Sequence, residues 1–227
     1  MRDSRTRLKG LAVGLLFSVL APSASAIEDW VVPPLMRVDK MSQTEYAHAW
    51  WQWIKSVPSV ASPLSDRTGE RCDLNQRGLV WFLANSNSKE PVERFCEIPK
   101  DKYLFVPILT QLAEPRMENE KPCAEMKAAS ALHWPHIEEI SLVLDGQEVT
   151  NLAAFRQKSR KCFDVLGGIP RERLPPKLYP AATQGYWVML RPLEAGEHEL
   201  RIRAKYRADH VRRGLIEQDV TYKINSY

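Results

Sequence analysis

The sequence predicts a mainly β fold, an antiparallel β-sandwich-like domain with two accessory helices that is stabilised by two disulfides. Several short apolar or alternating segments are separated by turn residues, a pattern typical of antiparallel sandwiches. Two other segments repeat their apolar residues at helical spacing. Four cysteines follow an N-terminal export segment, and an even number of cysteines in an exported chain indicates disulfides.

Residues 1–26 are predicted to be a secretory signal peptide. Four cations precede the apolar run Leu11–Leu20, which is too short to span a membrane. Ala24-Ser25-Ala26 has the small residues of a cleavage site, so the mature chain is expected to begin at Ile27. Residues 27–227 then form one exported domain, periplasmic or extracellular, with enough chain for a hydrophobic core.

Cleavage would remove most of the net positive charge. The chain has a formal net charge of +4, and residues 1–26 contribute four cations and one aspartate. The mature chain therefore carries 28 positive and 27 negative side chains, which does not favour a nucleic-acid-binding protein. No later apolar run is long enough for a transmembrane span, and no motif predicts a cofactor.

The cysteines at positions 72, 96, 123 and 162 allow three pairings. We expect Cys72–Cys96 and Cys123–Cys162, because each of these pairs closes a modest local loop. The chain has no C-x-x-C motif, and the spacings do not match a zinc cluster. A structural role is therefore predicted for all four.

The mature chain is expected to begin with an extended lead-in, residues 27–41, and a helix over residues 42–57. Ser42 and Glu45 fit a capping box at its start, and Pro58 ends it. Its apolar face is made of Tyr46, Ala49, Trp50, Trp53, Ile54 and Val57. Trp51 lies off this face.

A loop is predicted over residues 59–76, followed by three strands and the second helix. The strands are Gly78–Ala84, Val92–Ile98 and Tyr103–Leu109. Pro107 indicates that the third strand lies at an edge or contains a bulge. The helix is predicted over Pro122–His133, because proline suits a first turn.

The C-terminal half is expected to be mostly strands. Glu139–Leu144 alternates, and Asp145-Gly146 after it predicts a tight hairpin turn. Gly167–Thr183 contains two glycines and four prolines and is expected to be a long exposed connection. The remaining predicted strands are Tyr186–Pro192, His198–Tyr206 and Asp219–Asn225.

The chain resembles a family of uncharacterised exported bacterial proteins. The resemblance lies in the Trp-rich first helix and in the motifs C-x3-Q-x-G-x-VWFLA (72–84), C-x-IP-x2-K-x-LF-x-P (96–107), GYWV (185–188) and GEH (196–198). It covers most of residues 42–225 and departs at Asn85, where the family would have glycine. It implies secretion and a β-rich domain and assigns no catalytic residue.

Two patterns supply candidate ligand-binding residues. Trp51 is the member of the tryptophan cluster expected to be exposed, where its indole face would stack a sugar ring; the alternative is that the whole cluster packs in the core. In the strand His198–Tyr206, alternation places a row of cations on one face. This row comprises Arg201, Arg203, Lys205 and Arg207. It suits an acidic glycan or an envelope component, unless carboxylates on neighbouring strands neutralise it.

The evidence for catalysis is weaker. Asp66, Glu70 and Asp73 cluster in one loop and provide the alternative prediction of a secreted hydrolase with two working carboxylates. His133 and His136 flank a proline, so a helix-end or packing role is expected and no metal site is predicted. The favoured hypothesis is a non-catalytic binding or interaction module for a glycan or a cell-envelope partner.

Overall fold

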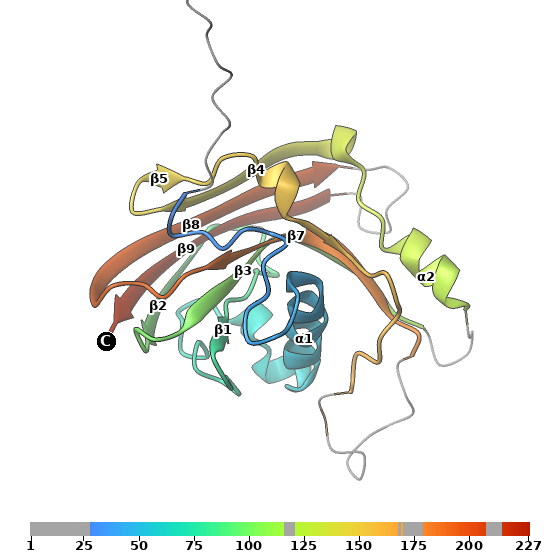
Figure 1. Cartoon of the computed structure of the whole chain (residues 1–227), viewed down its shortest axis with the longest axis horizontal. Helices are drawn as coiled ribbons and strands as arrows, with labels where there is room; N and C mark the ends of the chain where they lie inside the picture. The colour runs from blue at the N-terminus through green and yellow to red at the C-terminus, as the bar shows by residue number, and fades with distance from the viewer. Residues whose placement is uncertain (1–27, 116–120, 168, 170–178, 208–214) are drawn as a thin grey trace, which may run out of the picture.

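The computed structural model describes residues 28–115, 121–167, 169, 179–207 and 215–227. The predicted signal peptide and most of the predicted connection 167–183 lie outside these residues. The described chain forms three layers, in which helix α1 (Gln43–Lys55) covers one face of a four-stranded sheet and a five-stranded sheet covers the other (Figure 1). The domain is therefore mainly β, as predicted.

The four-stranded sheet has the strand order β1-β3-β7-β6. Its strands are β1 (Val80–Phe82), β3 (Tyr103–Ala113), β7 (Ala182–Leu190) and β6 (Arg156–Lys158). The five-stranded sheet has the order β2-β9-β8-β4-β5. Its strands are β2 (Val92–Ile98), β9 (Leu215–Ser226), β8 (Gly196–Arg207), β4 (Ile137–Leu144) and β5 (Gln147–Glu148).

Two cores hold the layers together. The larger lies between the sheets and contains inward side chains of both, such as Val188 and Ile202. The smaller lies between α1 and the four-stranded sheet, where Trp50 packs against Trp187 at 6.3 Å between ring centroids. Because β7 is buried on both faces, its apolar residues form a continuous run without alternation.

Helix α1 begins where its capping box predicts. The Ser42 side chain accepts a hydrogen bond from the backbone N–H of Glu45, and the Glu45 carboxylate accepts one from the backbone N–H of Ser42. The other α-helix, α2 (Cys123–Ala129), is shorter than the predicted Pro122–His133. Ser130 caps it, and the carbonyl oxygen of Leu132 accepts hydrogen bonds from two side chains of the four-stranded sheet.

Short 3₁₀ helices connect these elements. They are η1 (Ser59–Ala61), η2 (Pro63–Ser65), η3 (Trp134–His136) and η4 (Leu152–Phe155). The first two lie in the predicted loop 59–76, and η3 begins directly after His133, where the predicted second helix would have ended.

Both predicted disulfides are present, with Cα–Cα distances of 5.8 Å. Cys72–Cys96 fastens the loop before β1 to strand β2. Cys123–Cys162 fastens α2 to the segment that follows β6. The first bridge therefore ties a loop to a sheet, and the second ties a short helix to the irregular segment after β6.

Two strand pairs differ from the antiparallel prediction. β1 pairs with β3 and β2 pairs with β9 in parallel, whereas the other pairs are antiparallel. The chain passes from β1 to β2 in the other sheet and then returns to β3, so β1 and β3 run in the same direction. Pro107 lies in the centre of the sheet, where the predicted bulge shifts the register between Pro107 and Leu109.

Candidate functional site

The cation row of β8 lies on the outer face of the five-stranded sheet. Its residues alternate with buried ones, as Arg201 does with Leu200 and Ile202. Most of the row is paired with carboxylates. Arg203 lies 3.5 Å from Asp219, and Lys205 and Arg207 lie 3.4 and 2.7 Å from Glu138. Only Arg201 of this row has no carboxylate within 4.0 Å among the described residues.

Carboxylates also dominate the hollow beside this row. It has a volume of about 140 Å³ and lies between β4, β8 and β9. Its lining includes Glu139, Glu217 and Asp219 against a single cation, Arg203. An anionic ligand would be repelled here. The β8 row is thus largely balanced within its own sheet.

Trp51 lies on the opposite side of the molecule, on α1. It is half-buried, its indole N–H donates to the hydroxyl of Thr183 at 2.7 Å, and its ring meets Trp50 edge-on at 4.7 Å. Two sheets and the core between them separate this helix from the β8 row (Figure 1). The structure does not bring the two sets of predicted binding residues together.

The loop carboxylates do not converge either. Asp66 is 6% exposed and accepts hydrogen bonds from the backbone N–H groups of Thr68, Gly69 and Arg71 at 2.9–3.0 Å. Burial alone would raise the pKa of Asp66, but these N–H groups outweigh it and lower the pKa. Glu70 and Asp73 are exposed. Asp66 therefore shapes the turn that contains it.

Arg94 is a buried cation that sequence reasoning missed. It is 1% exposed and donates to the carbonyl oxygens of Asp66, Ala84 and Asn85 and to the hydroxyl of Tyr222 at 2.5–3.1 Å. The cavity beside it measures about 10 Å³, which is room for a single water molecule. The alternation in β2 could have located Arg94, because Val92, Cys96 and Ile98 occupy the same inward face.

His48 and Ser159 have the spacing of a base and a nucleophile, with 2.8 Å between Nε2 and Oγ. Ser159 is 7% exposed, and its hydroxyl oxygen accepts the backbone N–H of Thr183. The imidazole stacks on Phe163 at 4.1 Å, and burial lowers the pKa of His48 to about 4. The pair links α1 to the four-stranded sheet and leaves no open hydroxyl for a substrate.

A second cation row, called the β6 row below, begins on strand β6 at the edge of the four-stranded sheet and ends at Arg160, two residues after the strand. Arg156, Lys158 and Arg160 are exposed and alternate with the buried Gln157 and Ser159. In the described part of the chain, no carboxylate lies within 4.0 Å of any of the three, nor of the next residue, Lys161. No strand was predicted here, so the alternation of exposed cations with buried residues was not recognised in the sequence.

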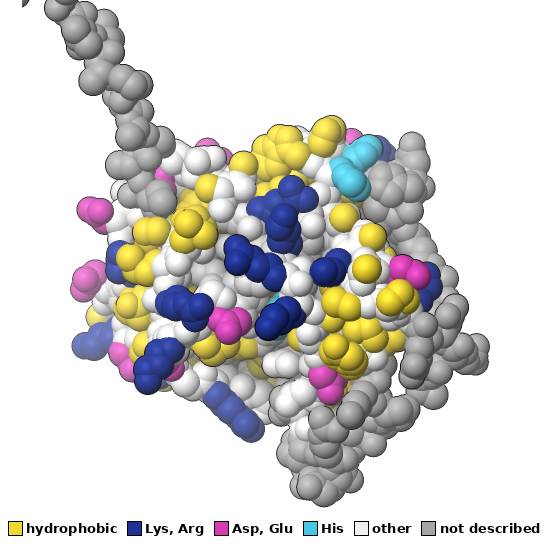
Figure 2. Space-filling model, turned by 45° about the vertical axis from the view of Figure 1, so that its right-hand side comes forward, with side chains coloured by type: hydrophobic (Ala, Val, Ile, Leu, Met, Phe, Trp, Pro, Cys, Tyr) yellow, Lys and Arg dark blue, Asp and Glu magenta, His cyan; other side chains and the backbone are white. Residues whose placement is uncertain are grey.

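The surface view agrees with this distribution of charge. Figure 2 brings the right-hand side of Figure 1 forward, and Lys and Arg side chains gather over the middle of that face with few Asp or Glu side chains among them. Strand β6 runs beside β7 on this side. Because β6 is the last strand in the order of the four-stranded sheet, its exposed cations Arg156 and Lys158 lie at the edge of that sheet.

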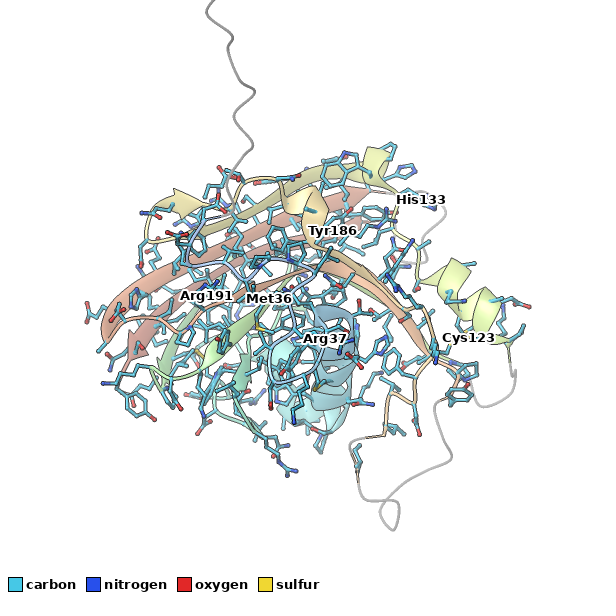
Figure 3. The ribbon with its side chains drawn as sticks, in the orientation of Figure 1. Met36, Arg37, Cys123, His133, Tyr186 and Arg191 are labelled. Atoms are coloured by element: carbon cyan, nitrogen blue, oxygen red, sulfur yellow. A yellow bond between two sulfur atoms is a disulfide. The ribbon has the colours of Figure 1, made fainter. Side chains whose placement is uncertain are left out.

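An exposed aromatic side chain lies at one end of the β6 row. Trp134 in η3 is 47% exposed, and its ring centroid is 5.8 Å from that of the buried Tyr186. Tyr186 is the cross-strand neighbour of Arg156. Figure 3 labels Tyr186 near the centre of the upper half of the molecule and His133, the residue before Trp134, at its upper right. Sequence reasoning noted the histidines of this segment but passed over its tryptophan.

No protein-family model matches the chain, and no curated protein sequence matches it either. None of the helices in the described ranges is long and apolar enough to cross a membrane. Nor do three or more His, Cys, Asp or Glu side chains of the described chain gather as a metal site would require. The function must be argued from the surface itself.

Proposed function

We propose that the chain is an exported, non-catalytic binding module for an anionic glycan or another anionic component of the cell envelope. The observation that carries this proposal is the β6 row, three exposed cations at alternate positions, two on strand β6 and one just after it, with no carboxylate of the described residues within 4.0 Å. The two disulfides are consistent with an exported protein.

The contrast between the two cation rows supports the choice of surface. Exposed ion pairs such as Arg203–Asp219 contribute only about 0–1 kcal/mol, but their carboxylates still repel an incoming anion. A ligand at the β6 row meets no such competitor among the described residues. It would also displace little, since the one hydrogen bond of the Arg156 side chain within the described ranges goes to the carbonyl oxygen of Leu132 at 2.7 Å.

Binding of the mature, oxidised protein to dextran sulfate and to uncharged dextran tests this proposal. We expect binding to the sulfated polymer alone, and weakening as salt is raised because exposed charges are screened. The double variant Lys158→Glu/Arg160→Glu should lose at least about tenfold in affinity. The matched control, Arg201→Glu/Arg203→Glu in the β8 row, makes the same charge change and should lose much less.

Failure to bind any anionic polymer or envelope extract would overturn the proposal. If the control variant lost as much affinity as the test variant, the result would contradict the assignment of anion binding to the β6 row. The alternative of a secreted hydrolase gains no support from the loop, because Asp66 is occupied by backbone N–H groups and Glu70 and Asp73 are exposed.

A further inference from the structure

We infer that the anionic partner is an acidic polysaccharide, and that Trp134 provides a stacking surface for one of its sugar rings at the Arg156 end of the β6 row. This inference rests on the proposed function, and it names the ligand class and the residue that would distinguish a sugar from other anions.

The fold holds Trp134 in place while leaving about half of it open. Its 3₁₀ helix contains Pro135, which restricts the backbone, and its ring packs against Tyr186 with an interplanar angle of 59°. Tyr186 is 1% exposed and belongs to the core between the sheets. An indole fixed on one side and open on the other loses little conformational freedom when a ligand binds.

The tryptophan and the cations belong to one surface. Arg156 pairs with Tyr186 across the strands, and its guanidinium donates to the carbonyl oxygen of Leu132, two residues before Trp134. Lys158 follows Arg156 on the same side of strand β6 at a step of about 6.5 Å. Arg160 comes two residues later, after the strand has ended, and is also exposed. The result is a line of positive charges with an aromatic face at one end.

This arrangement matches the chemistry of a uronic acid polymer. A pyranose ring presents an apolar C–H face that packs on indole while its hydroxyl groups stay hydrated. Its carboxylate projects from the ring edge, where a guanidinium can bind it through two parallel hydrogen bonds. Each following sugar of the polymer carries another carboxylate, which could face the next cation of the β6 row. A lipid surface would not require an aromatic face at the end of the row.

The test compares two polycarboxylates, polygalacturonate, which has sugar rings, and polyglutamate, which has none. Trp134→Leu keeps an apolar cover over Tyr186 but removes the aromatic face. We expect it to weaken polygalacturonate binding by about threefold to tenfold and to leave polyglutamate binding unchanged. Trp134→Phe should retain most of the affinity, and circular dichroism should show both variants folded.

Three outcomes would overturn the inference. If Trp134→Leu lost equal affinity for both polymers, or lost none for polygalacturonate, Trp134 would not be a sugar-stacking residue. The anion-binding function would still stand on the result of the charge-reversal variants. Tighter binding of the wild type to phosphatidylglycerol vesicles than to polygalacturonate would identify a lipid surface instead. If the wild type bound neither polymer nor vesicles, the proposed function itself would fail.

Discussion

Arg94 is a cation whose partners are mostly backbone carbonyl oxygens. Its guanidinium joins three separate segments, the loop at Asp66, the residues after β1 and strand β9 at Tyr222. It also lies over the Tyr222 ring at 5.4 Å. Only a planar, forked donor can reach all these oxygens at once.

Arg94→Lys should therefore destabilise the protein. A single ammonium group cannot satisfy three carbonyl oxygens and a hydroxyl, so we expect the free energy of unfolding in urea to fall by about 3 kcal/mol. Arg77→Lys makes the same substitution at an exposed arginine and is the matched control. Its free energy of unfolding should change by less than about 0.5 kcal/mol. Equal effects of the two substitutions would contradict this role.

His48 should make the protein less stable in mild acid. Its folded pKa is about 4 against an ordinary value of 6.5, because burial disfavours the charged imidazole. Between these values the unfolded chain binds a proton that the folded chain does not, so stability falls as the pH falls, by about 3 kcal/mol at most. Urea unfolding across this range should show a shallower pH slope for His48→Gln than for the wild type.

His198 should act in the opposite direction. Its burial alone would lower the pKa, but hydrogen bonds to Asp145 at 2.7 Å and to the Glu194 carbonyl at 2.9 Å raise it above 6.5. The stabilisation is then complete below pH 6.5 and is lost as the pH rises through the folded pKa. His198→Asn should cost stability at about pH 5.5 and almost none at about pH 9; the same cost at both would disprove the linkage.

At the level of elements, the two disulfides should protect different parts of the protein. Cys72–Cys96 spans 24 positions and Cys123–Cys162 spans 39, so each is expected to contribute about 3–4 kcal/mol. The seven-residue α2 is too short to persist by itself. Removal of the Cys123–Cys162 disulfide should therefore unfold α2 before the sheets unfold.

Hydrogen exchange of the double variant Cys123→Ser/Cys162→Ser provides the measurement. We expect rapid exchange in α2 and retained protection in β3, β7 and β8. The control Cys72→Ser/Cys96→Ser should leave α2 protected and loosen the loop before β1. Slow exchange in α2 of the first variant would show that its packing at Met126 suffices.

The elements that the sequence predicted best are those with local determinants. The capping box marks the start of α1, and the strand predicted over Val92–Ile98 has the same bounds as β2. The start of β7 was placed in the connection 167–183 because of the glycines and prolines of that segment. Thr183 and Gln184 are instead buried, and their side chains donate to the carbonyl oxygens of Gln111 and Leu132. The parallel pair β1–β3 was missed because the strand between them, β2, lies in the other sheet, which the sequence pattern does not reveal.

At the level of the whole molecule, the two cation rows look alike in sequence and differ only in their surroundings. Glu138 reaches the β8 row from the bulged start of β4, and Asp219 reaches it through the β8–β9 register. β6 lies at a sheet edge, with a neighbouring strand on one side only. Which row keeps its charge thus depends on register and strand order, which composition does not reveal.

The position of β9 has a consequence for biogenesis. This last strand of the described chain lies inside its sheet, between β2 and β8. Until it arrives, strand β2 has no partner in that sheet, and its inward face stays open to water. Because a chain is synthesised from its N-terminus to its C-terminus, this sheet can close only after β9 has been made, and until then its exposed apolar face is open to chaperones.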